Sequence, residues 1–150
     1  MNTLNKVGAI SFILWGLLHV VGGAAILAAL ADGPAQGYAV YLQHAGSYTA
    51  LSGAILGYFA YLILVTGVAA TVIGGWLNWR NSQAGLAVNT IMIGVVDAGL
   101  VYFLVLPGFV SWGDAAIGLV LYTVAIVTGG LACNAGHRAL PVQGSATALR

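Results

Sequence analysis

The sequence predicts an all-α integral membrane protein: a four-helix bundle with four transmembrane helices. Of its 150 residues, 61% are hydrophobic and only 5% are charged, whereas soluble domains carry about 25% charged residues. The hydrophobic residues gather in four runs, each close to the roughly 20 residues that a helix needs to cross a bilayer. A transmembrane β-barrel would instead show segments of about ten residues with alternating polarity.

The four apolar runs cover residues 7–31, 51–77, 84–106 and 114–133. With their connections they form a single transmembrane domain over residues 1–139, followed by a predicted disordered cytoplasmic tail at 140–150. The alternative for the first run is a signal peptide cleaved near Ala29-Leu30-Ala31. Because the run is longer than the usual 7–15 apolar residues of a signal peptide and contains a histidine, we expect a retained helix.

The charged residues predict which helix ends share a side of the membrane. Basic residues precede the first run, separate the second from the third and follow the fourth: Lys6, Arg80, Arg138 and Arg150. The other two connections hold Asp32 and Asp114 and no Lys or Arg. By the positive-inside rule, this pattern predicts a cell inner (plasma) membrane protein with both termini in the cytoplasm.

The first outer connection is the longest. Asp32-Gly33-Pro34 indicates a turn. Residues 38–45 then predict a short interfacial helix, anchored by Tyr38, Tyr41 and Tyr48. His44 is either solvated or, together with Tyr41, lines an entrance.

Two ionisable residues stand near the centres of apolar runs, His19 in the first and Asp97 in the third. An acidic residue at that depth costs about 2.5–3.5 kcal/mol and is tolerated only where it faces the bundle interior, water or a partner. The same depth on the other runs holds Thr66, Tyr122 and Thr123. We therefore predict a polar layer for binding or proton relay, in which His19 and Asp97 share a proton or an ion pair. The alternative is a set of polar contacts that only fixes helix packing.

Small residues surround the two ionisable ones. Glycines three or four positions from His19 lie on its side of the helix. They allow close helix packing, as does the GxxxG pattern of Gly53-Ala54-Ile55-Leu56-Gly57. They otherwise leave space beside the histidine for a planar ligand such as haem or quinone. The predicted pocket lining is Trp15, Gly16, Gly22, Gly23 and Gly94.

Motifs for most cofactor and metal chemistry are missing from the sequence. There is no phosphate-binding loop or dinucleotide fingerprint, and the lone Cys133 excludes an intrachain disulfide or CxxC site. The three histidines lie at different depths, so a haem would need His19 from two subunits or as a single axial ligand. We expect no metal site and no resident cofactor, with haem or quinone near His19 as the alternative.

The midplane polar layer favours a proton-coupled transporter or a channel-like subunit. Two alternatives stay open: an accessory or anchor subunit of a membrane oxidoreductase complex, holding a lipid, quinone or haem near His19, and a membrane enzyme that uses His19 and Asp97 as acid and base on a lipophilic substrate. A net charge of +1 with four basic residues argues against nucleic acid. The expected partners are the lipid bilayer and either further copies of the chain or subunits of a larger complex.

Overall fold

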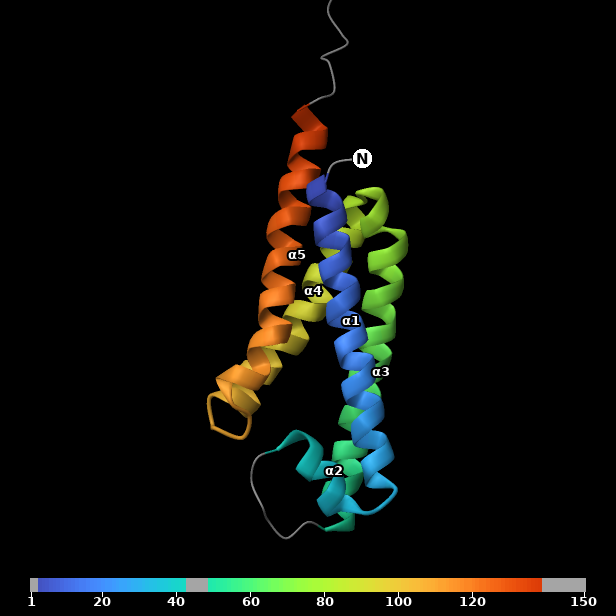
Figure 1. Ribbon diagram of the computed structural model, residues 1–150, viewed down its shortest axis with the longest axis vertical. Helices are drawn as coiled ribbons and strands as arrows, with labels where there is room; N and C mark the ends of the chain where they lie inside the picture. The colour runs from blue at the N-terminus through green and yellow to red at the C-terminus, as the bar shows by residue number, and fades with distance from the viewer. Residues whose placement is uncertain (1–2, 43–48, 139–150) are drawn as a thin grey trace, which may run out of the picture.

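The computed structural model describes residues 3–42 and 49–138, and every element in these ranges is helical (Figure 1). In chain order the elements are α1 (Thr3–Leu30), α2 (Pro34–Tyr41), α3 (Ala50–Trp76), the 3-10 turn η1 (Asn78–Arg80), α4 (Gln83–Leu100), the π-helical segment η2 (Val101–Val105) and α5 (Trp112–Arg138). Four segments are long and apolar enough to cross a membrane: Thr3–Leu30, Ala50–Arg80, Gln83–Val105 and Trp112–Ala135. The prediction of an all-helical chain with four membrane-spanning candidates is confirmed.

Hydroxyl side chains set where three of the long helices begin. Thr49, Ser82 and Ser111 each accept a hydrogen bond from the backbone N–H three residues further on, at 3.2, 3.2 and 3.1 Å. Such a cap satisfies one of the backbone donors that a helix start leaves unpaired. The second, third and fourth apolar runs therefore begin one or two residues inside their helices. The helix α5 also continues past residue 133, because polarity ends a hydrophobic run without ending a helix.

The turn after α1 forms as predicted, but the short helix begins earlier than expected. Gly33 has φ 123°, in the region that favours glycine, and α2 starts at Pro34 because the fixed φ of proline suits the first position of a helix. Tyr38 packs against the cluster around Ile26 and donates a hydrogen bond to Ser52 O at 2.9 Å. The Tyr38 side chain thus joins α2 to α3, and its role as an interfacial anchor stays a prediction.

Glycines bring α1 and α3 into direct backbone contact. A Cβ added to Gly16 would lie 2.6 Å from Gly67 O, and one added to Gly67 would lie 2.6 Å from Gly16 O. A Cβ on Gly23 would lie 2.7 Å from Ala60 O. These spacings exclude any side chain larger than hydrogen without a shift of the helices, so Gly16 and Gly23 serve close packing.

The GxxxG pattern of α3 also packs within the chain. A Cβ on Gly53 would lie 2.9 Å from Pro34 Cγ, and one on Gly57 would lie 3.4 Å from Leu30 Cδ1. Small residues here make room for the end of α1 and the start of α2.

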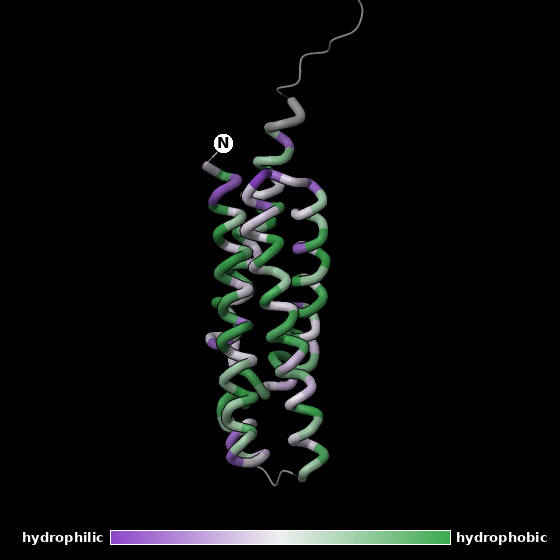
Figure 2. The backbone as a smooth tube through the Cα atoms, turned by 90° about the vertical axis from the view of Figure 1, so that its right-hand side faces the viewer, coloured by the Kyte–Doolittle hydropathy of each residue, from purple (hydrophilic) through white to green (hydrophobic). Residues whose placement is uncertain are grey.

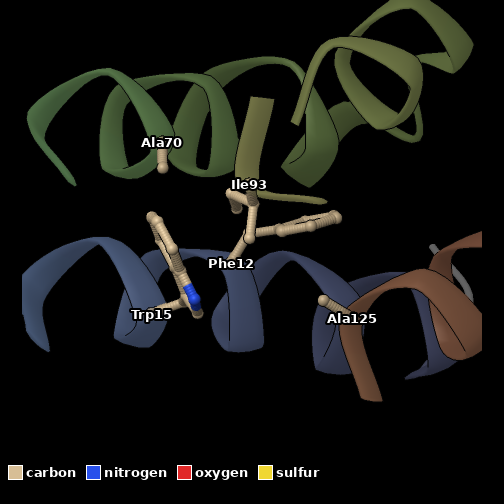
Figure 3. Packing of buried hydrophobic residues seen from close by; sticks show 5 residues of the cluster. All are labelled: Phe12, Trp15, Ala70, Ile93 and Ala125. Carbon is tan, nitrogen blue, oxygen red and sulfur yellow. The ribbon is translucent and has the colours of Figure 1, made fainter. Parts of the chain in front are cut away.

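All four long helices meet in one buried cluster. Phe12 and Trp15 of α1 lie against one residue from each of the other three helices (Figure 3). The cluster consists of Phe12, Trp15, Ala70, Ile93 and Ala125, each with 0% of its surface exposed. Their complete burial makes this the tightly packed part of the molecule.

The helices separate away from this cluster. In Figure 1 the α4–α5 pair diverges from the α1–α3 pair toward the end where α2 lies. The start of α1, the turn η1 and the end of α5 lie at the opposite end. Figure 2 shows hydrophobic positions along most of the helix length and hydrophilic positions gathered toward the ends. We call the end where the helices lie together the closed end of the molecule, and the end where the two pairs diverge the open end.

Candidate functional site

His19 lies half-buried on α1, one turn beyond Trp15. Its Nδ1 lies 2.8 Å from Trp15 O, and the two rings stack with centroids 3.6 Å apart and planes 21° apart. A carbonyl oxygen can only accept, so Nδ1 carries a proton and donates it in this hydrogen bond. The stack and the hydrogen bond together fix the orientation of the imidazole.

Asp97 on α4 is buried, with 3% of its surface exposed. Its Oδ1 accepts a hydrogen bond from Trp15 Nε1 at 3.3 Å. Its Oδ2 is fully buried and has no hydrogen-bond partner in the described part of the chain. A carboxyl group in this setting is half-satisfied, which is an uncommon arrangement for a buried polar group.

Trp15 connects His19 to Asp97, and no hydrogen bond or ion pair joins the two ionisable residues directly among residues 3–42 and 49–138. The direct His19–Asp97 contact that the sequence suggested therefore does not form here. The physical reason is steric: the indole stacks on the imidazole and directs its N–H at the carboxyl group.

The other residues of the predicted polar layer take different positions. Thr66 lines a cavity together with His19. Tyr122 donates to Thr90 O at 2.9 Å and so ties α5 to α4. Thr123 is exposed and donates to Leu119 O of its own helix at 2.8 Å, so it does not contribute to the layer.

Two cavities meet at His19, in the open half of the molecule. The α3–α4 cavity has a volume of about 480 Å³, and the α1–α5 cavity has a volume of about 470 Å³. Both volumes fall within the roughly 300–1,000 Å³ of typical small-molecule pockets. His19, Leu42, Ile63 and Leu100 line both. Asp97 lines neither of these two cavities, so the acid and the base do not face one shared space.

The α3–α4 cavity is almost entirely hydrocarbon. The polar side chains in its lining are those of His19, Tyr38 and Thr66, and the Tyr38 hydroxyl is already bonded to Ser52 O. It opens to the surroundings beside three exposed lining residues, Ile55 of α3, Val95 of α4 and Phe103 of η2, which are 60%, 70% and 66% exposed. An apolar mouth of this kind suits entry from lipid.

The α1–α5 cavity has a more polar end. Asp114, at the start of α5, lines it together with Gly22 of α1. A Cβ added to Gly22 would meet nothing within 4 Å, so Gly22 leaves open space in this cavity. Gly94, in contrast, makes room for the Tyr122 hydroxyl, 2.6 Å from its ideal Cβ position.

The predicted entrance falls largely beyond what the structure describes. His44 and Tyr48 lie outside the described residues, and of Tyr41 only the backbone is described, as the last residue of α2. The entrance formed by His44 and Tyr41 stays a prediction.

A second polar cluster, near the closed end, was missed by the sequence reasoning. Asn89 of α4 is 0% exposed, and its Nδ2 lies 3.4 Å from Ala70 O and 3.1 Å from Asn78 Oδ1. Asn5 donates to Trp79 O at 2.9 Å. An asparagine inside an apolar run is the signal that was available, and its role here is to join helices.

Comparison with protein-family models, curated proteins and solved structures gives no match. Within residues 3–42 and 49–138, no group of three or more His, Cys, Asp or Glu side chains is placed to hold a metal ion.

Proposed function

We propose that this chain binds a lipophilic small molecule in the α3–α4 cavity, with His19 as its polar anchor. This is the role expected of an accessory or anchor subunit that holds a lipid or a quinone-type molecule for a membrane oxidoreductase. The observation that carries the proposal is a ligand-sized hydrocarbon cavity with a mouth of exposed apolar residues and one imidazole, that of His19, in its lining. Pockets for small molecules combine apolar walls with a few polar groups in this way.

Packing around His19 favours binding over transport or catalysis. The fully buried residues Phe12 and Trp15 lie between His19 and the closed end of the molecule. A transport route would have to pass this cluster. An enzyme using His19 and Asp97 together would need both groups at one substrate, whereas the α3–α4 cavity receives only His19.

The charge distribution supports a plasma-membrane location with both termini in the cytoplasm. Lys6 and Arg80 lie over the rings of Trp79 and Trp76, at 5.8 and 5.9 Å, near the closed end of the bundle. Asp114 lies at the open end. Basic residues retained at one membrane face, beside aromatic rings, are typical of the cytoplasmic side. Association with further copies or with other subunits is part of the same proposal.

Filling the cavity tests the binding proposal. Gly99 lines the α3–α4 cavity, and a Cβ added there meets nothing within 4 Å. We expect Gly99→Trp to reduce binding of 4-nonylphenol at least tenfold, measured by native mass spectrometry of the full chain in nanodiscs, because the indole occupies the ligand volume.

Gly130 on α5 provides the matched control. A Cβ added to Gly130 also meets nothing within 4 Å. Gly130→Trp therefore adds the same side chain away from the cavity, and we expect it to leave binding unchanged. Equal binding by the Gly99 and Gly130 variants, or no binding by the wild type above that of empty nanodiscs, would contradict the proposal.

Proton-coupled transport is the second candidate, and the unpartnered Oδ2 of Asp97 favours it. A carboxyl group held this way and linked through Trp15 to His19 offers a site for a proton inside the bundle. We expect, if transport occurs, pH-dependent flux in liposomes that disappears in Asp97→Asn and persists in Asp114→Asn. Flux that is unchanged in Asp97→Asn, or that the wild type lacks, would eliminate this candidate.

A further inference from the structure

The hydrogen bond inside α1 determines which nitrogen of His19 is available to a ligand. Nδ1 donates to Trp15 O at 2.8 Å, because that oxygen can only accept. In the neutral ring the other nitrogen, Nε2, then has no proton and offers a lone pair. The donor position of this histidine is already used, and the acceptor position is not.

Nε2 has no competing partner in the described ranges. In the described residues, His19 makes its hydrogen bond through Nδ1. Nε2 is not among the fully buried side-chain atoms that lack a partner, so it is not fully buried. Since His19 lines both cavities, this nitrogen is accessible from the open half of the molecule. The ring carbon Cε1 of His19, next to Nε2, would lie 3.7 Å from a Cβ added to Gly118 of α5. On that side the ring therefore faces the backbone of α5 at a glycine.

A charged imidazolium would present the opposite chemistry, but its surroundings disfavour it. No carboxylate lies within ion-pair distance of His19 among residues 3–42 and 49–138, since Asp97 bonds to Trp15 instead. An unpaired charge beside a hydrocarbon cavity is costly. The neutral ring with a bare Nε2 is therefore the form that the cavity meets.

We propose, on the basis of the binding function above, that the ligand carries a hydroxyl group and donates its O–H to His19 Nε2. The chemical class is a lipophilic phenol, hydroquinone or long-chain alcohol. A quinone carbonyl or an ester offers only acceptors and would face the lone pair of Nε2. The site consequently selects the reduced, hydroxylated form of a quinone-type molecule over its oxidised form.

A pair of ligands that differ in this one donor tests the inference. 4-Nonylphenol and 4-nonylanisole have the same ring and chain, but the anisole has a methyl ether in place of the hydroxyl. We expect the wild-type chain in nanodiscs to bind the phenol about three- to tenfold more tightly, the effect of one net hydrogen bond. His19→Phe keeps an aromatic ring against Trp15 and should remove this preference.

Two further variants separate the role of Nε2 from general effects. His19→Gln places an amide near the position of Nε2 and, because an amide both donates and accepts, should bind phenol and anisole with less discrimination than the wild type. Thr123→Val removes an exposed hydroxyl that is bonded only within its own helix, and should keep the full preference.

The nitrogen itself can be observed in chain labelled with ¹⁵N-histidine. We expect the Nε2 resonance of His19, assigned by its loss in His19→Gln, at the position of an unprotonated nitrogen, and a shift when 4-nonylphenol is added. Equal binding of the two probes that Gly99→Trp abolishes, or a protonated Nε2, would overturn the donor inference and leave the binding function standing. No binding of either probe would overturn the binding function itself.

Discussion

Replacing Gly16 by valine is expected to lower the free energy of unfolding by about 2–3 kcal/mol, at the upper end of the range for overpacking. A Cβ at this position would lie 2.6 Å from Gly67 O and 2.8 Å from Thr71 N, and would also overlap the Thr71 hydroxyl. Two of these three atoms belong to the backbone of α3, so the added carbon can be accommodated only if α1 and α3 move apart. Unfolding in mixed detergent–SDS micelles, followed by circular dichroism, measures the loss.

Gly22→Val is the matched control for this prediction. The two glycines lie on the same helix, and valine makes the same change in helix propensity at both. Because nothing lies within 4 Å of a Cβ on Gly22, we expect its variant to stay within about 0.5 kcal/mol of the wild type. An equal loss at both positions would show that propensity, and not packing against α3, determines the effect.

The different surroundings of these glycines could not be predicted from the sequence. Helical periodicity correctly places Gly16, Gly22 and Gly23 near one side of α1, but that side is wide. Gly16 and Gly23 contact α3, whereas Gly22 faces a cavity. Which part of the face meets a neighbouring helix depends on how α1 is rotated in the bundle, and the sequence of α1 alone does not contain that information.

The helices themselves were predictable because membrane-spanning segments depend on local composition. Run length and low charge located all four. Their starts were also readable in retrospect, from the hydroxyl caps at Thr49, Ser82 and Ser111. The start of α2 was missed because Asp32-Gly33-Pro34 was interpreted only as a turn, although proline also suits the first position of a helix.

The candidate site was predictable in its members and not in its connections. His19 and Asp97 stand out as ionisable residues within apolar runs, and Trp15 was expected beside them. That the indole would lie between the two depends on the packing of α1 against α4. Tyr122 and Thr123 illustrate the same limit: they share a depth, but neighbouring helix positions point about 100° apart, so one joins helices and the other is exposed.

The second large effect is expected at the Trp15–Asp97 hydrogen bond. Trp15→Phe removes the donor and leaves both oxygens of a buried carboxyl group without a partner. We expect a loss of about 2–3 kcal/mol in the free energy of unfolding, since a buried unsatisfied group costs about 1–3 kcal/mol and more when charged. The same micelle assay measures it.

A double-mutant cycle separates this hydrogen bond from the loss of indole volume. Asp97→Leu removes the carboxyl group, so in Trp15→Phe/Asp97→Leu no unsatisfied acceptor remains. We expect the free energy of unfolding of the double variant to be about 1–2 kcal/mol higher than the two single changes predict when they are added. A cycle pairing Trp15→Phe with Thr123→Val should be additive, because Thr123 bonds only within α5. Additivity in both cycles would mean that the contribution of Asp97 to stability does not depend on the hydrogen bond from Trp15. Coupling in the first alone would establish that the ring which orients His19 is itself held in place from α4.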